Sequence, residues 1–311
     1  MKIVFLDQAT MGDDISFKPF EELGDYHGWP LTSPDEVVSR ISDADVVIVN
    51  KVVIGKPEID TAPRLKLICV AATGTNNIDV EYASSKGIPV KNVKGYSTES
   101  VTQITFSLIL ALLDHILYFD SFVKSGEYSR GRMYSNLQRQ FSELNTMVFG
   151  IIGMGDIGKN VARIATAFGA KVQYYSTSGV AHCKDYPMVK LDELLGTSDI
   201  ISIHSPLNDR TKNLVTLKEL RMMKSSAIIV NIGRGGIINE ADLARAVDEG
   251  IIAGAAVDVY EKEPIPQDHP YLKMKNKDRI LLTPHVGWAS VQARTLLAAK
   301  IVENIKSVLK I

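Results

Sequence analysis

The sequence has few cysteines, no excess of charge of either sign and no long apolar run. Its two cysteines, Cys69 and Cys183, lie far apart in a chain of 311 residues and show no metal-ligand spacing. A disulfide framework is therefore excluded, no metal site is predicted, and both side chains are predicted to be reduced structural thiols. The 35 basic and 36 acidic side chains give a net charge of −1. This balance indicates neither a nucleic-acid partner nor a membrane surface.

Segments that would leave the aqueous phase are missing as well. The longest nearly uncharged segment, 99–114, contains Thr102, Thr105 and Ser107, and it is too short and too polar to span a bilayer. The apolar run within residues 1–7 is too short for a signal peptide and predicts a strand. We therefore expect a cytoplasmic protein. Its length and its 45% of hydrophobic residues allow a large core and predict two domains.

The most informative stretch is 147–177, M-V-F-G-I-I-G-M-G-D-I-G-K-N-V-A-R-I-A-T-A-F-G-A-K-V-Q-Y-Y-S-T. An apolar run at 148–152 predicts a buried strand, and Gly153, Gly155 and Gly158 then form G-x-G-x-x-G before a helical pattern and a second strand. The first glycine permits a tight turn, the second lets the backbone approach a pyrophosphate, and the third lets the helix pack on the strand. The helix N-terminus adds free N–H groups. We therefore predict a dinucleotide-binding domain rather than an ordinary glycine turn.

Strand and helix patterns alternate along the whole chain. Before residue 97, strands are predicted at 2–6, 45–49, 65–70 and 89–92, and helices at 17–23, 33–41 and 79–86. A single long apolar helix is predicted at 98–123, followed by an irregular polar segment. After residue 177, strands are predicted at 200–204, 227–232, 253–257 and 280–283, and helices at 191–195, 217–223, 239–247 and 289–309. This alternation predicts an α/β fold with two doubly wound parallel-sheet domains.

In such sheets, ligands bind beyond the carboxyl ends of the strands. In the first domain, the small-residue turn Ala72-Thr73-Gly74 follows a predicted strand, and its backbone N–H groups suit a carboxylate. Lys51 follows another strand. A plain tight turn and a merely solvated lysine are the alternatives. We predict Lys51, Ala72, Thr73 and Gly74 as substrate-binding residues.

Three ionisable residues follow separate strands of the second domain. Arg234 lies in N-I-G-R-G-G, and its planar, permanently charged guanidinium suits a bidentate contact with a carboxylate. His285 follows L-L-T-P, and histidine is the side chain that transfers protons near neutral pH. Glu263 lies in D-V-Y-E-K-E-P, and a carboxylate beside His285 would orient its ring and favour the imidazolium form. Each residue alone has a structural explanation, but their common position predicts a catalytic site.

These motifs resemble the D-isomer-specific 2-hydroxyacid dehydrogenases. The matching segments are, in order, G-I-I-G-M-G-D-I-G-K, H-S-P-L-N-D-R-T-K-N-L, I-V-N-I-G-R-G-G-I-I-N-E-A-D-L, G-A-A-V-D-V-Y-E-K-E-P and L-L-T-P-H-V-G-W-A-S. The resemblance implies an NAD(P)-dependent oxidoreductase acting on small 2-hydroxy or 2-keto acids. In it, Arg234 would anchor the substrate and polarise its carbonyl, His285 would be the general acid–base, and Glu263 would be the partner of His285.

The resemblance also implies the domain organisation and the assembly. A Rossmann cofactor domain, 100–289, would be inserted into a flavodoxin-like substrate domain formed by 1–99 plus 290–311, and the protein would be a homodimer. The implied cofactor-binding residues are Thr102, Gly153, Met154, Gly155, Asp156, Ile157, Gly158, Ser176, Thr177, Ser178, His204, Ser205, Pro206, Thr211, Ile232, Gly233, Asp258 and Gly287.

Within the family, A-A-T-G-T-N-N-I-D and N-V-K-G-Y-S-T-E-S-V are most similar to glycerate dehydrogenase/hydroxypyruvate reductase. We therefore expect D-glycerate/hydroxypyruvate or glyoxylate as the substrate. Phosphoglycerate dehydrogenase is an alternative, but its members tend to have an arginine where this chain has Val70. A dinucleotide-sensing corepressor of the same fold, which keeps the same three residues, is another alternative. Formate dehydrogenase fits less well, because its extra polar site residues are missing.

The position that decides between NAD and NADP holds no carboxylate. NAD-preferring members of this fold place an Asp or Glu about 20 residues after the glycines, where this chain has Ser176, Thr177 and Ser178. A carboxylate would repel a 2′-phosphate, whereas hydroxyl groups bind either a ribose or a phosphate. We therefore expect both NAD and NADP to bind, with a slight preference for NADP. An acidic residue from elsewhere in the fold would reverse this expectation.

Overall fold

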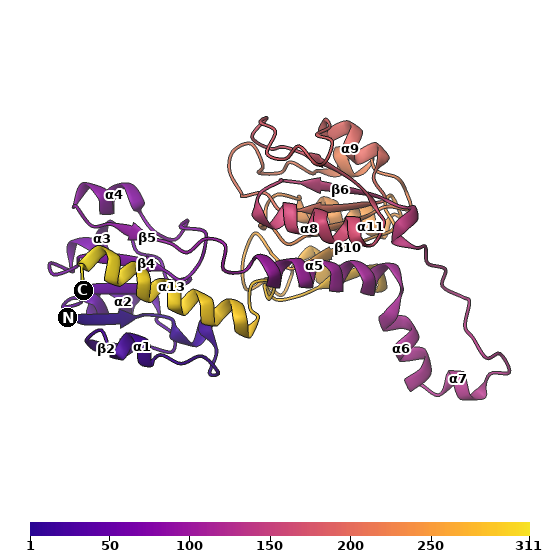
Figure 1. Cartoon of the computed structure of the whole chain (residues 1–311). Coiled ribbons are helices and arrows are strands. Elements are labelled where there is room, and N and C mark those ends of the chain that lie inside the picture. The colour runs from indigo at the N-terminus through magenta and orange to yellow at the C-terminus, as the bar shows by residue number, and fades with distance from the viewer. The chain divides into compact units, whose positions relative to one another are not determined.

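The computed structural model describes all 311 residues and divides into two compact units. The first unit comprises Met1–Ser97 and Ala289–Ile311, and the second comprises Thr98–Trp288. Each unit contains one all-parallel sheet, so the predicted α/β class with two doubly wound sheets is confirmed (Figure 1).

The first unit contains a five-stranded sheet in the order β2-β1-β3-β4-β5. The strands are β1 (Lys2–Phe5), β2 (Asp25–Gly28), β3 (Val46–Val49), β4 (Leu67–Val70) and β5 (Val90–Lys91). The helices are η1 (Gln8–Met11), α1 (Lys18–Glu21), η2 (Pro34–Glu36), α2 (Val37–Ile41), α3 (Lys56–Asp60), α4 (Val80–Ser85) and α13 (Val291–Leu309). All residues of β3 and β4 are buried, because α2, α3 and α4 cover one face of the sheet while α13 packs on β4.

Besides the single-turn 3₁₀ helix η1, two elements of this unit were not predicted. The edge strand β2 is Asp-Tyr-His-Gly, and it has no apolar run because it is exposed at every second residue. The short helix α3 buries Ile59 alone among its residues. Both elements depend on pairing or packing with neighbours, so the local sequence gives little signal for them.

The second unit contains a six-stranded sheet in the order β11-β10-β9-β8-β6-β7. The strands are β6 (Val148–Ile152), β7 (Lys171–Tyr175), β8 (Ile200–Ile203), β9 (Ile228–Asn231), β10 (Gly254–Val257) and β11 (Ile280–Leu282). The chain runs from β6 outward to β7 and then returns to place β8 on the other side of β6. This reversal is a topological switch point, where doubly wound sheets bind their ligands at the carboxyl ends of the strands.

Helices cover both faces of this sheet. They are α5 (Thr98–Leu113), α8 (Asp156–Ala167), α9 (Leu191–Thr197), α10 (Leu217–Leu220), α11 (Glu240–Asp248) and α12 (Pro270–Lys273), with the short η3 (Leu144–Thr146) and η4 (Lys277–Arg279). On one face, α5 and α8 pack against each other through residues such as Phe106, Ile109 and Val161. On the other face, Leu194 and Leu243 from α9 and α11 are fully buried.

The prediction of one long helix at 98–123 was wrong. The helix α5 ends at Leu113, and α6 (Ile116–Lys124) follows at an angle of 61°. His115, between them, has a left-handed backbone with φ of 52°. The apolar pattern continues across this break, so composition alone did not reveal it. Beyond it, α6 and α7 (Glu127–Arg130) project from the rest of their unit (Figure 1).

The structure contains no single helix that is long and apolar enough to cross a membrane. The pair α5 and α6 meets the requirements of length and composition only as a bent span. Both cysteines are free thiols, as predicted. Cys69 lies in β4, and its burial raises the pKa of its thiol to about 12.

Candidate active site

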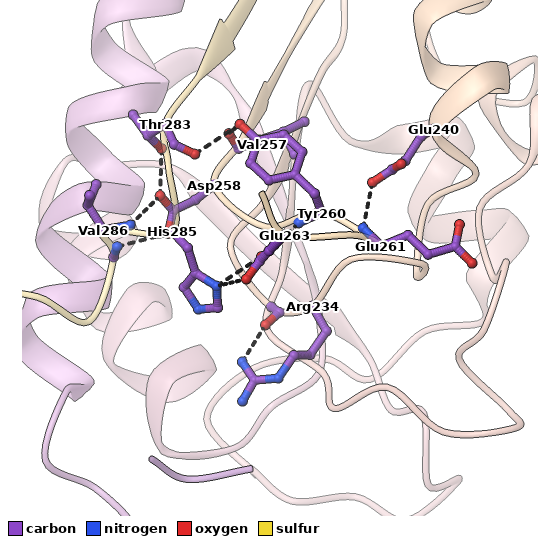
Figure 2. A network of polar contacts seen from close by, with 12 residues as sticks. Arg234, Glu240, Val257, Asp258, Tyr260, Glu261, Glu263, Thr283, His285 and Val286 are labelled. Carbon is purple, nitrogen blue, oxygen red and sulfur yellow. Dashed lines mark hydrogen bonds and ion pairs between the residues drawn. The ribbon is translucent and has the colours of Figure 1, made fainter. Parts of the chain in front are cut away.

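The three predicted catalytic side chains come from loops that follow adjacent strands. Arg234 follows β9, Glu263 follows β10 and His285 follows β11, and these strands are neighbours in the sheet. Because all three strands are parallel, their carboxyl ends share one edge, and the loops converge there (Figure 2).

Glu263 and His285 form a direct pair. The Nδ1 atom of His285 lies 2.7 Å from Oε2 and 2.9 Å from Oε1 of Glu263 (Figure 2). The backbone N–H of Tyr260 donates to Oε1 of Glu263 at 3.0 Å and fixes the carboxylate. Both side chains are about a quarter exposed, at 23% for His285 and 26% for Glu263. The carboxylate holds the Nδ1 proton, so the other ring nitrogen, Nε2, is the atom that can exchange a proton with a ligand.

His285 sits in a backbone conformation that its neighbours impose. Its φ is 55°, in the left-handed region that costs roughly 1–3 kcal/mol for a residue with a Cβ. Asp258, only 1% exposed, accepts three hydrogen bonds from the surrounding turn. The donors are Oγ1 of Thr283 at 2.6 Å, N–H of Val286 at 2.8 Å and N–H of Gly287 at 2.8 Å. The predicted cofactor residues Asp258 and Gly287 are thus bonded to each other.

Arg234 lies in a loop that hydrogen bonds to Asn231 and Gly233 hold in place. Nη1 of Arg234 donates to the carbonyl of Gly233 at 2.8 Å, and the side chain of Asn231 donates to the Arg234 carbonyl at 2.9 Å. Asn231 also accepts from the N–H of Gly233 at 3.1 Å. The half-buried guanidinium keeps its remaining donors for a ligand. This arrangement suits a planar anion such as a carboxylate.

The glycine turn after β6 has the geometry that its motif predicts. Gly153 has φ of 97°, and a Cβ there would lie 2.8 Å from the backbone nitrogen of Ser205. A Cβ on Gly158 would overlap the carbonyl of Gly153, so α8 packs directly on the turn. A Cβ on Gly155 would meet nothing within 4 Å. The backbone is therefore open at Gly155, next to the N-terminus of α8, where an anionic group is favoured.

A cavity of about 500 Å³ lies beside this turn. The predicted residues that line it are Gly153, Met154, Gly155, Ser176, Thr177, Ser178, His204, Ser205 and Pro206, joined by the unpredicted His182, Asn208, Asp209 and Arg210. The cavity is thus bordered by the residues that follow β6, β7 and β8. No sequence pattern pointed to His182, and the loop 208–210 belonged to a recognised motif without a role of its own.

Two buried polar atoms at this cavity have no partner in the protein. They are Nδ1 of His204 and Oγ of Ser205, and they are the only such side-chain atoms in the structure. The other ring nitrogen of His204 lies 2.8 Å from Oγ of Ser202, and burial lowers the pKa of His204 to about 3. Unpaired buried polar atoms cost free energy until a ligand satisfies them. The open glycine turn and these two atoms fit a dinucleotide.

Other predicted residues lie around this core. Asp156 and Ile157 open α8, and Ile232 and Gly233 follow β9. Thr211 is fully buried, and its hydroxyl donates to the carbonyl of Pro206 at 2.7 Å, so it braces the loop after β8. Thr102 lies on α5, where its hydroxyl donates to Thr98 and accepts from Asn160 on α8.

The predicted substrate residues belong to the first unit. Lys51 follows β3, and the backbone N–H groups of residues 50–52 all donate to the carboxylate of Asp7. The turn with Ala72, Thr73 and Gly74 follows β4, and Oγ1 of Thr73 donates to the carbonyl of Val93 at 3.0 Å. Asn77 connects the two loops, since its amide donates to the carbonyl of Val52 at 2.8 Å.

Comparison with known proteins gives consistent matches. A family described as "D-isomer specific 2-hydroxyacid dehydrogenase, NAD binding domain" matches residues 106–287. A hydroxypyruvate reductase of Blautia hydrogenotrophica is 37% identical, covering 100% of this chain and 97% of its own length. A glycerate dehydrogenase of Methylorubrum extorquens is 34% identical, covering 98% and 95%. The structure of an acyclic imino acid reductase with NADPH and D-Arg has a TM-score of 0.88 at 30% identity, covering 100% and 97%.

The low pKa of His204 predicts a contribution to acid sensitivity. The unfolded chain binds a proton below the ordinary histidine pKa of about 6.5, but the folded protein does so only near 3. Stability is therefore fully present above pH 6.5 and falls as the pH drops toward 3, by up to about 1.4 kcal/mol per pH unit. His204→Gln removes this term, so its melting temperature should fall less between pH 7 and pH 5 than that of the wild type. Equal losses would contradict the prediction.

Proposed function

Because the chain belongs to the D-isomer-specific 2-hydroxyacid dehydrogenase family, as its motifs predicted, we propose that it interconverts hydroxypyruvate and D-glycerate or reduces glyoxylate. The reaction class, an NAD(P)-dependent dehydrogenation of small 2-hydroxy acids, follows from membership. The observation that carries the proposal is the Glu263–His285 pair, which lies at the same sheet edge as Arg234. The proposed substrates are supported by two relatives, a hydroxypyruvate reductase and a glycerate dehydrogenase.

We assign the catalytic roles as follows. In reduction, Nε2 of His285 donates a proton to the keto oxygen, and in oxidation it takes the proton of the hydroxyl group. Glu263 stabilises the ring in its charged form and keeps Nε2 directed at the substrate. Arg234 binds the substrate carboxylate. When bound, the nicotinamide supplies the hydride for reduction and accepts it in oxidation.

The two units receive separate roles in the proposal. Residues 100–289 form the cofactor domain, in which the cavity beside the glycine turn holds the adenosine end and the pyrophosphate. Residues 1–99 with 290–311 form the substrate domain, in which Lys51 and the turn 72–74 contact the substrate. The lysine charge and the backbone N–H groups of the turn support this assignment, because both suit an acid.

We also propose a cytoplasmic homodimer. The region of α6 and α7 and the chain after it carries exposed large apolar side chains, namely Ile116, Leu117, Val123, Tyr128, Met133, Tyr134, Leu137 and Phe141. A monomer rarely exposes so many large apolar groups in one segment. A second copy would cover them.

The function is tested by measuring NAD(P)H oxidation against hydroxypyruvate, glyoxylate, pyruvate and 3-phosphohydroxypyruvate. We expect the highest kcat/KM with hydroxypyruvate or glyoxylate. His285→Ala should lower kcat about 10²–10⁴-fold, because general acid–base catalysis contributes that much, while cofactor binding is retained. Turnover near the wild-type value in this variant would refute the role of His285. A higher kcat/KM with 3-phosphohydroxypyruvate would refute the proposal that hydroxypyruvate or glyoxylate is the substrate.

Arg234→Lys tests the carboxylate contact. Lysine keeps the positive charge but cannot form two parallel hydrogen bonds, so KM for the keto acid should rise markedly and kcat should fall. The lysine variant should retain its affinity for NADH in a fluorescence titration. If KM does not change, the substrate carboxylate binds elsewhere, and Lys51 with the turn 72–74 is then the site to test.

Cofactor choice is tested at Ser176. Its hydroxyl is directed inward, donating to the carbonyl of Val180 at 2.6 Å, whereas Ser178 lies 2.7 Å from Nε2 of His182 at the cavity. Arg210 supplies a cation to the same cavity, and Asp209 supplies a carboxylate. We propose that both cofactors are accepted, with a modest preference for NADP, because the position after β7 lacks an acid.

Ser176→Asp should lower kcat/KM for NADPH far more than for NADH, because its carboxylate repels the 2′-phosphate. Ser176→Asn is the matched control of similar size without the charge. Binding of 2′,5′-ADP, followed by calorimetry, should weaken in the Asp variant alone. A wild-type protein that already rejects NADPH by orders of magnitude would contradict the proposal and would point to Asp209.

A further inference from the structure

A buried, hydrogen-bonded pair of side chains lies behind the candidate site. Glu240 is the first residue of α11, and His269 caps the N-terminus of α12. Their side chains are only 13% and 4% exposed, and Nε2 of His269 lies 2.8 Å from Oε2 of Glu240. Neither residue belongs to the predicted site. Burying a carboxylate is unfavourable unless hydrogen bonds compensate for the lost water, so this pair needs an explanation beyond stability.

The hydrogen bonds around the pair define the tautomer of His269. The Nδ1 atom of His269 accepts from the backbone N–H of Tyr271 at 3.3 Å, so the ring proton is on Nε2 and is donated to Glu240. The other oxygen of Glu240, Oε1, accepts from the backbone N–H of Glu261 at 2.8 Å (Figure 2). Both oxygens of Glu240 therefore accept. A glutamine cannot replace it, because its NH₂ group would face a donor.

The peptide that is hydrogen-bonded to Glu240 is adjacent to the peptide that is hydrogen-bonded to Glu263. Glu261 follows Tyr260, whose N–H donates to Oε1 of Glu263 at 3.0 Å. The hydroxyl of Tyr260 donates to the carbonyl of Thr283 at 2.9 Å, just before the His285 turn. Burial, with the charges of nearby carboxylates, raises the pKa of Tyr260 to about 12, so this hydroxyl remains a donor. Glu240 and the carbonyl of Thr283 thus fix residues 260 and 261, and the N–H of Tyr260 in turn binds Glu263.

The Arg234 loop meets the same segment. A Cβ on Gly235 would overlap the backbone carbonyl of Tyr260 and the amide of Glu261, so the two loops are in backbone contact there. The Arg234 loop leads directly into α11, which begins with Glu240. Glu240 is therefore attached to one loop by the chain and to the other by a hydrogen bond.

We propose that Glu240 and His269 are positioning residues that fix the Glu263 loop against the Arg234 loop, and thereby orient His285 for proton transfer. The proposal rests on the catalytic roles assigned above to Glu263 and His285. The buried histidine restricts Glu240 to one orientation, and Glu240 holds the peptide next to the one that supports Glu263. Removing either member lets the segment 260–263 shift, and the acid–base pair loses its alignment.

The experiment compares Glu240→Gln with Glu263→Gln as the reference and Glu249→Gln as the control. Glu249 lies just beyond the other end of α11, in an exposed ion pair with Arg245 at 2.7 Å. Both Glu263→Gln and Glu240→Gln should shift the pH profile of kcat/KM for reduction to more acid values, because the imidazolium loses a well-placed carboxylate. Glu240→Gln should also lower kcat about tenfold to a hundredfold, with unchanged NADH affinity. The control should behave as the wild type.

Variants of His269 test the same idea without altering Glu240. His269→Leu removes the donor and should reproduce the effect, whereas His269→Gln can place an N–H near the position of Nε2 and should restore much of kcat. A lower melting temperature with unchanged kcat and pH profile in Glu240→Gln and His269→Leu would overturn the proposal. If Glu263→Gln itself leaves the pH profile unchanged, the assigned role of Glu263 is wrong and the proposal falls with it. If one of the two variants, Glu240→Gln or His269→Leu, does not fold, the kcat and pH profile of the other variant test the proposal.

Discussion

The site depends on a single buried carboxylate, that of Asp258. By accepting from Thr283, Val286 and Gly287 it closes the turn after β11 and holds His285 in a left-handed conformation. The same carboxylate follows β10 directly, so it ties the ends of two adjacent strands. Without these bonds the unfavourable backbone of His285 would relax, and its ring would not meet Glu263. The geometry that we propose for catalysis is thus supported by one residue that needs no contact with substrate.

Much of the fold was predictable because parallel sheets bury both faces. Strands such as β3, β6 and β8 are nearly continuous runs of buried residues rich in Val and Ile, and each is followed by turn residues. Elements without such runs were missed, as β2 shows, since its pairing with β1 depends on residues more than twenty positions away. The break at His115 was missed for a related reason. Hydrophobic periodicity measures burial along a helix, but it does not record a single residue with positive φ.

The candidate reactive side chains were easier to predict from the sequence than the loop contacts that hold them in place. Arg234, Glu263 and His285 could be predicted as candidate site residues because they follow strand ends, and the pairing of Glu263 with His285 is present in the structure. Arg210 and His182 border the cavity from loops whose course no local pattern indicates. The contact between Gly235 and the peptide of Tyr260 brings together positions about 25 residues apart on two loops. Such contacts arise only when the sheet has assembled.

The discontinuity of the first unit has a consequence for biosynthesis. The second unit is continuous, so all of its residues have left the ribosome once position 288 has emerged. The first unit must wait for α13, whose Leu297, Ile301 and Ile305 are fully buried, and which packs on β4 from the far end of the chain. The unit whose synthesis starts first is therefore completed last, and the part of β4 that α13 covers stays exposed until that helix has been made. This interval is when the nascent chain is most open to chaperones and to misassociation with other chains.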